Sequence, residues 1–204
     1  MNLPIDQDER GLTMKTALLL IDIQNDYFPN GRLQLEKSIE ACQKAQEVLQ
    51  AYRAKQMLTV HIRHISTDTG AKHLLPCTKG AEFHPNVQPT KNEVVITKHY
   101  PNSFKDTGLL NHLNKNHVKN LVIGGMMTHM CIDATVRAAY DLGFSCTVLS
   151  DACATKNLEF NNMLIPAQTV HSAFLAALQP LYSDVITVRE LLNAPVNSRI
   201  AEEV

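Results

Sequence analysis

Runs of consecutive apolar residues recur along the chain, and they constrain its fold more than any other feature. Residues 16–23 read TALLLIDI, which is typical of a strand buried on both faces, as in a parallel sheet. Similar runs follow at 57–62, 93–98, 120–125, 144–149 and 184–188. These runs predict six strands in a mainly parallel sheet.

Segments with helical periodicity separate most of the apolar runs. Between 36 and 54, apolar side chains repeat at spacings of three or four residues, which indicates an amphipathic helix. The same pattern is found at 106–116, 130–142 and 164–179. Alternating strands and helices imply right-handed crossovers and helices on both faces of the sheet. The predicted fold class is therefore α/β, with three α/β/α layers.

The length of the chain predicts one domain. Its 204 residues, 45% of them hydrophobic, can bury one sizeable core, so we expect a single domain over 1–204 with its core at about 16–190. The ends at 1–14 and 194–204 are expected to be loosely held or partner-bound tails. The stretch 65–92 contains two glycines and three prolines and has weak periodicity. Irregular connections of this length are usually functional.

Charge and cysteine content indicate which kinds of molecule the protein can bind and in which compartment it is found. The 19 basic and 20 acidic residues nearly balance, which gives no electrostatic footprint for nucleic acid or an anionic membrane. The five cysteines are odd in number and follow no metal-finger spacing, so reduced thiols fit best. The first residues lack the apolar segment of a secretory signal, and no apolar run approaches membrane-spanning length. We therefore expect a cytoplasmic protein that acts on a small molecule.

Two opposite charges close two of the predicted strands. Asp22 lies near the end of the first apolar run, and Lys98 ends the run EVVITK. Taken alone, the aspartate could cap a turn and the lysine could extend to solvent. Together they lie at the carboxyl edge of a parallel sheet, where ligands of open α/β folds bind. This edge is the predicted site of chemistry.

Cys131 follows the strand at 120–125 and opens the helix at 130–142. The positive end of the helix dipole and nearby Lys98 would both favour thiolate, so we expect a pKa below the usual value of about 8.5. The other cysteines lack this setting and are interpreted as packing residues, with Cys153 the least certain of the four. They are Cys42, Cys77, Cys146 and Cys153.

The local sequences around these residues resemble the isochorismatase-like cysteine hydrolases. The matching stretches, which span roughly 16–190, are IDIQNDYF, VVITKHYPNSF, VIGGMMTHMCIDATVRAAYDLGF and LSDACAT. The resemblance implies that Asp22, Lys98 and Cys131 form a catalytic trio. It also implies hydrolysis of an amide or related C–N bond through a thioester, with no cofactor.

The same resemblance implies an oxyanion hole ahead of the nucleophile. It places a non-proline cis peptide at Met126–Met127, so that the backbone N–H groups of Met127 and Cys131 point to one oxyanion. The Gly124–Gly125 pair before it permits close approach of the backbone. Neither GxGxxG nor GK[ST] follows this strand, which argues against a nucleotide loop.

The second predicted strand lies where related enzymes carry metal ligands. Nicotinamidases carry an Asp-x-His and a further His there, whereas this chain reads HIRHISTDTG, so no metal site is expected. His61 and His64 would point to opposite faces of the strand. His61 is expected to be a core histidine whose hydrogen bonds are satisfied, while His64 either reaches substrate or bonds locally. Tyr27 and Phe104 either line the substrate pocket or pack in the core.

Two other functions remain open at this point. An isochorismatase-type ether hydrolase would not depend on a cysteine nucleophile. A non-catalytic thiol redox or small-molecule-binding module would use Cys131 without turnover. The resemblance further implies a homo-oligomer, either a dimer or a tetramer, because such proteins usually assemble.

Overall fold

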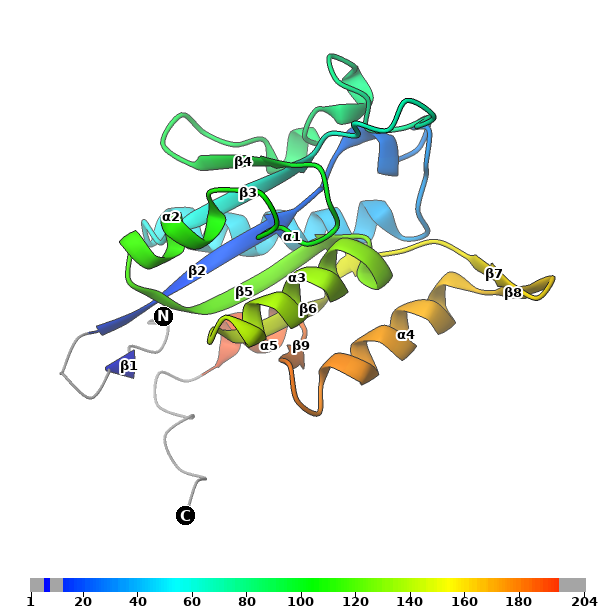
Figure 1. Cartoon of the computed structure of the whole chain (residues 1–204). Coiled ribbons are helices and arrows are strands. Elements are labelled where there is room, and N and C mark those ends of the chain that lie inside the picture. Colours follow the sequence, from blue (N-terminus) through cyan, green and yellow to red (C-terminus); the bar gives the residue numbers. More distant parts are fainter. Residues whose placement is uncertain (1–5, 8–12, 195–204) are drawn as a thin grey trace.

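A parallel sheet forms the centre of the computed structural model, which describes residues 6–7 and 13–194 (Figure 1). Six parallel strands follow the order β4-β3-β2-β5-β6-β9, and a short antiparallel strand, β1, pairs with β2. The prediction of six mainly parallel strands is confirmed. Their bounds, with β1, are Asp6–Gln7 (β1), Thr13–Ile21 (β2), Thr59–His64 (β3), Val94–Lys98 (β4), Val118–Met126 (β5), Ser145–Ala154 (β6) and Asp184–Ile186 (β9).

Strand β2 shows why the apolar runs lack polar alternation. Leu18 and Leu20 point into one hydrophobic cluster, whereas Leu19 and Ile21 point into the other, on the opposite face of the sheet. All four are at most 1% exposed. Because neither face of the strand meets water, every position is apolar.

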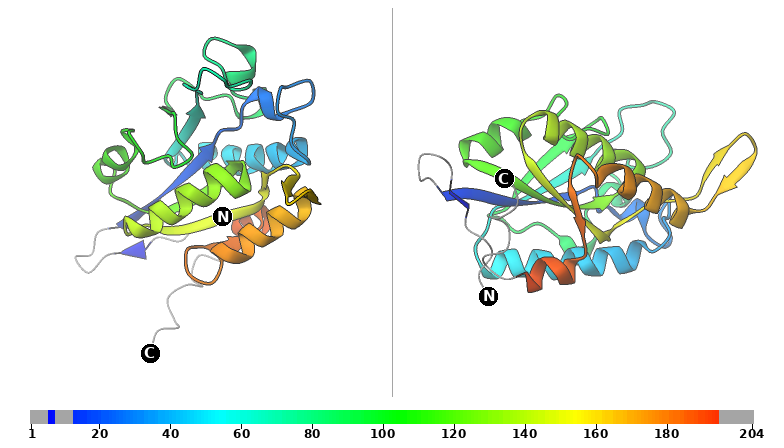
Figure 2. Two further views of the ribbon diagram at one scale, coloured as in Figure 1. Left: turned by 45° about the vertical axis from the view of Figure 1, so that its right-hand side comes forward. Right: turned by 90° about the horizontal axis from the view of Figure 1, so that it is seen from below.

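Helices cover both faces of the sheet (Figure 2). Helices α1 (Ser38–Ala54) and α5 (Val188–Asn193) pack on one face. The opposite face carries α2 (Leu109–Lys115), α3 (Asp133–Asp141) and α4 (Ala167–Leu178). The four predicted helices are confirmed with slightly shorter bounds. None of the helices in the described part of the chain is long and apolar enough to cross a membrane.

Helix α5 and the strands β1, β7 (Leu158–Phe160) and β8 (Met163–Ile165) were not predicted. Helix α5 has only six residues, and its one local signal is a capping box formed by Thr187 and Glu190. A hairpin of β7 and β8 extends away from the sheet, as Figure 1 and the right-hand view of Figure 2 show. Its turn residues, Asn161 and Asn162, both have positive φ, a conformation that asparagine tolerates in tight hairpins.

The segment 65–92 is irregular, as predicted. It contains two short 3-10 helices, η2 (Lys79–Ala81) and η3 (Pro85–Val87), and an isolated bridge between Phe83 and Gln24. Buried Asp26 anchors part of it, since its Oδ2 accepts a 2.6 Å hydrogen bond from the Leu74 backbone. The predicted tails at 1–14 and 194–204 lie largely outside the described residues; β1 pairs with residues 13–14 at the start of β2.

Candidate active site

Asp22 and Lys98 meet because their strands, β2 and β4, flank the same strand, β3, in the sheet. Asp22 follows β2 directly, with φ of 53°, and its N–H donates to Ile62 of β3 at 3.0 Å. Lys98 is the last residue of β4, in register with His64 of β3. Both charged side chains are completely buried, and Lys98 Nζ lies 2.6 Å from Asp22 Oδ2. The prediction that the two charges share one edge of the sheet is confirmed.

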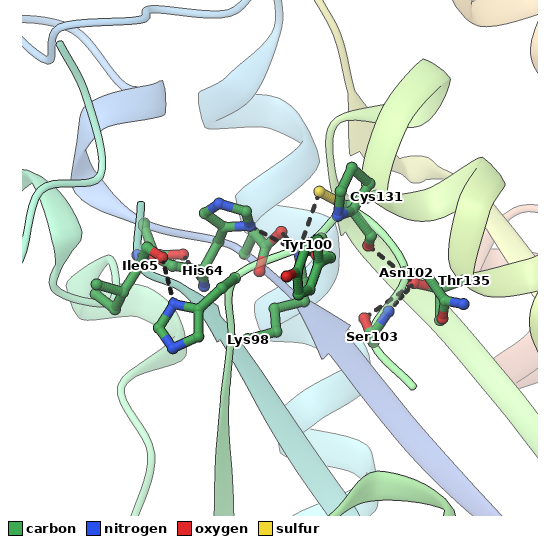
Figure 3. Close-up of polar contacts among 12 residues, drawn as sticks. His64, Ile65, Lys98, Tyr100, Asn102, Ser103, Cys131 and Thr135 are labelled. Carbon is green, nitrogen blue, oxygen red and sulfur yellow. Dashed lines mark hydrogen bonds and ion pairs between the residues drawn. The ribbon is translucent and has the colours of Figure 1, made fainter. Parts of the chain in front are cut away.

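The Lys98 ammonium is the centre of the site (Figure 3). Besides Asp22, its Nζ lies 3.1 Å from the Cys131 Sγ, 3.1 Å from His64 Nδ1 and 3.1 Å from the backbone oxygen of Tyr100. An ammonium has three N–H donors and no acceptor, so four neighbours share three protons. This crowding holds the lysine in one position between the carboxylate and the thiol.

Strand β5 approaches β2 closely just before the nucleophile. Gly125 pairs with Ile21, has φ of 137°, and a Cβ added there would lie 2.0 Å from the Ile21 oxygen. Only glycine can occupy this position. The predicted need for close backbone approach at Gly124–Gly125 is therefore confirmed at Gly125, and it brings the end of β5 beside Asp22.

Cys131 lies on a π-helical turn, η4 (Thr128–Ile132), that leads directly into α3. The peptide bond Met126–Met127 before this turn is cis, as the resemblance implies. Met127 is the residue that caps the turn. The structure thus places the amides of Met127 and Cys131 at opposite ends of one short segment. Their role as an oxyanion hole remains a proposal.

The prediction that Cys131 has a lowered pKa and is a thiolate is wrong for the substrate-free protein. The residue is 5% exposed, and burial raises the pKa of its thiol above the ordinary value. The negative charge of Asp22 raises it further, and together these effects outweigh the stabilisation of thiolate by Lys98. Sequence position alone could not show this, because it reveals the helix start but not the degree of burial. The resting site therefore holds a protonated thiol.

The same electrostatics keep Lys98 charged. Burial alone would lower its pKa, but the adjacent Asp22 carboxylate raises the pKa above the ordinary lysine value. Apart from Lys98 and neighbouring Cys131, the buried carboxylate of Asp22 has no hydrogen-bond partner among the described residues. Asp22 is thus a carboxylate with room to accept a proton.

His64 lies at the site rather than bonding elsewhere in the strand. Burial, followed by the positive charge of Lys98, lowers its pKa to about 4, so the ring is neutral at pH 7. Because Lys98 can only donate, Nδ1 of His64 accepts, and the ring proton is assigned to Nε2. His64 therefore bonds locally to Lys98 through Nδ1 and offers one N–H donor beside the trio, while its contact to substrate stays a prediction.

Tyr27 and Phe104 have different surroundings. Tyr27, in η1 (Asn25–Tyr27), is 2% exposed; burial raises its pKa, and the negative charge of nearby Asp22 raises it further. It therefore borders the trio while packing in the core. The ring of Phe104 stacks on Phe144, with centroids 5.9 Å apart, in the hydrophobic cluster below α2 and α3. Of the two alternatives left open for Phe104, the geometry favours core packing over a place in the substrate pocket.

His61 and His64 diverge, as the strand pattern predicts. His61 is fully buried, and its Nε2 lies 3.1 Å from Glu93, which also binds Arg53 at 2.7 Å. The prediction of a satisfied core histidine is confirmed for the burial of His61 and for its Nε2, but its buried Nδ1 has no hydrogen-bond partner among the described residues.

A possible metal-ligand group lies within the trio instead. Ligand atoms of Asp22, His64 and Cys131 all lie within 4.8 Å of one another, which could suit a metal ion. The Lys98 ammonium, however, lies 2.6 to 3.1 Å from atoms of all three side chains. In this arrangement a protonated amine supplies the positive charge that a metal would otherwise bring.

Gln24 is part of the site and was missed from the sequence. It is completely buried two residues after Asp22, and its side chain bonds to both the N–H and the C=O of His64, at 2.8 and 2.9 Å. The only feature of the sequence that could have pointed to Gln24 is its place directly after an apolar run, where its amide side chain would be buried. Partners 40 residues away are not visible in a local pattern.

The remaining cysteines lie away from the trio. Cys42, Cys146 and Cys153 are buried, and burial raises the pKa of each thiol to about 12. Cys153 lies within β6, which is longer than predicted, rather than after it. Cys77 is exposed in the irregular segment. The interpretation of these residues as packing cysteines fits the three buried ones.

Comparisons with known proteins agree with this geometry. The family model for the isochorismatase domain matches residues 16–190. The uncharacterised isochorismatase family protein YddQ of Bacillus subtilis is 47% identical over 88% of this chain and 99% of its own length. Maleamate amidohydrolase of Pseudomonas putida is 27% identical over 89% of this chain and 87% of its own. The crystal structure of an isochorismatase from Pseudomonas putida superposes with a TM-score of 0.81 at 32% identity, covering 86% of this chain and 89% of that one. The chain belongs to the isochorismatase family of hydrolases.

Proposed function

We propose that this protein is a cysteine hydrolase that cleaves an amide or related C–N bond of a small molecule through a covalent thioester. One observation carries the proposal: Lys98 Nζ contacts Asp22 at 2.6 Å and Cys131 at 3.1 Å inside a buried site. A nucleophile, a base and a cation that orients both are the parts that acyl transfer needs. The similarity to maleamate amidohydrolase supports an amide as the bond cleaved.

In the first half-reaction, Cys131 attacks the carbonyl carbon of the substrate while its thiol proton passes to Asp22. Because burial holds the proton on sulfur in the resting state, proton transfer accompanies the attack. The new C–S bond converts the carbonyl oxygen into an oxyanion. Collapse of this intermediate breaks the C–N bond, and Asp22 returns its proton to the leaving nitrogen, which departs as ammonia or an amine.

In the second half-reaction, water attacks the thioester and gives a proton to Asp22. Collapse of the second oxyanion breaks the C–S bond, and Asp22 reprotonates the sulfur to restore the thiol. Lys98 remains an ammonium throughout and balances the negative charge that develops on sulfur. In both halves the backbone N–H groups of Met127 and Cys131 would bind the oxyanion, where one such donor contributes roughly 10²–10³ in rate.

The two alternative functions fit the geometry less well. An ether hydrolase has no use for a cysteine set between a carboxylate and an ammonium. A redox-sensing thiol needs thiolate character and exposure, yet Cys131 is 5% exposed and burial raises the pKa of its thiol. Both observations favour turnover over sensing.

The cellular compartment, the partners and the oligomeric state are also proposals. We place the protein in the cytoplasm as an enzyme that uses no nucleic acid or membrane surface, in line with its nearly balanced charge and its five free cysteines. We further propose a homo-oligomer, a dimer or tetramer, to which exposed Phe160, Met163 and Leu164 of the hairpin would contribute contacts. Sedimentation at micromolar concentration, with only monomer found, would exclude the oligomer.

A panel of small amides tests the proposed reaction. We expect at least one primary amide, lactam or carbamoyl compound to release ammonia or amine, because the trio is complete. Dialysis against a chelator should leave this rate unchanged, since Lys98 already supplies the cation among Asp22, His64 and Cys131. Loss of turnover that zinc or manganese restores would show that a metal, and not the ammonium, is the working cation.

A further inference from the structure

Gln24 joins three parts of the molecule that are distant in sequence. Its backbone N–H donates to the Asp22 oxygen at 2.9 Å. Its Oε1 accepts from the His64 N–H at 2.8 Å, and its Nε2 donates to the oxygens of His64 at 2.9 Å and Ala81 at 2.8 Å. The completely buried amide thus links the end of β2, the end of β3 and the turn η2 in the segment 65–92.

These bonds hold the backbone of His64 at the end of β3. One side chain, that of Gln24, bonds both the N–H and the C=O of His64, the last residue of β3. The ring of His64 then presents Nδ1 to Lys98 at 3.1 Å. Lys98 in turn contacts Asp22 and Cys131. A continuous set of contacts therefore runs from Gln24 to the nucleophile.

We infer that Gln24 is a positioning residue that acts through His64 to hold the Lys98 ammonium against Cys131, and that it connects the segment 65–92 to the reaction. This inference rests on the proposed function for its effect on turnover, but its effect on the Cys131 thiol does not require any substrate. Without the hydrogen bonds from the Gln24 side chain, the ring of His64 shifts and Lys98 loses one of the acceptors that hold it. A small misplacement of catalytic groups costs up to about 10²-fold in rate.

The experiment uses the full chain with Gln24→Met, which keeps the length of the side chain but removes its hydrogen bonds. We expect kcat/KM to fall roughly 10- to 100-fold, with kcat falling as well as KM rising, because Lys98 itself is displaced. The matched control is Asn25→Ala. Asn25 anchors the same turn through a 2.9 Å bond to the Lys79 oxygen but does not touch His64. Its loss should change kcat/KM less than about threefold.

A second readout follows the thiol directly. The rate at which iodoacetamide alkylates Cys131, measured on its peptide across pH, should move to higher pH in Gln24→Met, because a displaced Lys98 stabilises thiolate less well. His64→Asn should give the same shift, and adding Gln24→Met to it should add little. Gln24→Glu keeps the acceptor but loses both donors, so a shift in the same direction is expected, and it replaces Gln24→Met if that variant does not fold.

The outcomes separate the two proposals. A shifted alkylation profile without hydrolysis of any amide by the unmodified protein would support the role of Gln24 and remove the proposed function. An unchanged profile in the Gln24 variants, an equal shift in Asn25→Ala, or losses from Gln24→Met and His64→Asn that multiply, would overturn the role of Gln24.

Discussion

Replacing Cys131 with alanine is expected to lower kcat by a factor of about 10⁴–10⁶, the range found when the nucleophile of a covalent hydrolase is removed. The reason is that no thioester can form without the sulfur, while the remaining groups only bind and polarise the substrate. Single-turnover kinetics with the best amide of the panel would measure the loss.

The control for this variant is Cys146→Ala. Cys146 is also buried, at 6% exposed against 5% for Cys131, but it packs within β6 away from the trio. Each substitution removes one buried sulfur, so both should change stability by a similar small amount, about 1 kcal/mol. Cys146→Ala should retain full turnover. Substantial turnover by Cys131→Ala would instead favour the ether hydrolase.

The charged pair should behave as one unit in turnover. Asp22→Asn and Lys98→Met should each lower kcat by roughly 10³ or more, and the double variant should lose far less than the product of the two, because either change alone already disables proton transfer from Cys131. Steady-state kinetics of the three variants form the test. Losses that multiply would mean that Asp22 and Lys98 act independently.

The pair should also be coupled in stability. Both side chains are 0% exposed, so removing one partner leaves an unpaired buried charge, a change that typically costs about 3–5 kcal/mol. Removing both charges should cost less than removing either one. Lys44→Met is the matched control, because Lys44 pairs with Glu47 at the surface at 2.7 Å and should leave both stability and turnover nearly unchanged. Denaturant unfolding of the four variants measures this coupling.

Much of the fold could be predicted from the sequence because it depends on periodicity, whereas the catalytic role of the trio came from the resemblance to the isochorismatase-like hydrolases. A strand buried on both faces is apolar at each position, as in β2, so an ionisable residue such as Asp22 marks its end. Parallel strands end at one edge, so Asp22, Lys98 and Cys131 could be brought together before any coordinates were known. The helices followed from spacings of three and four residues.

What could not be predicted depends on contacts between distant segments. The hydrogen bonds between the Gln24 side chain and the His64 backbone join residues 40 apart in the sequence, so no local sequence pattern reveals them. The protonation of Cys131 depends on burial and on the balance between Asp22 and Lys98, whereas the sequence shows only a thiol near a helix start. Phe104 illustrates the same limit, since its neighbour Phe144 comes from another part of the chain.

Rapid quenching of the enzyme with a good substrate tests the covalent mechanism most directly. Acid added during the first turnovers, followed by peptide mass analysis, should show a mass increase equal to the acyl group on the peptide that contains Cys131. Peptides with Cys42, Cys77, Cys146 and Cys153 should be unmodified. If substrate is turned over while no acyl group is found on Cys131, or the acyl group is found on another cysteine, the covalent account of this site is contradicted.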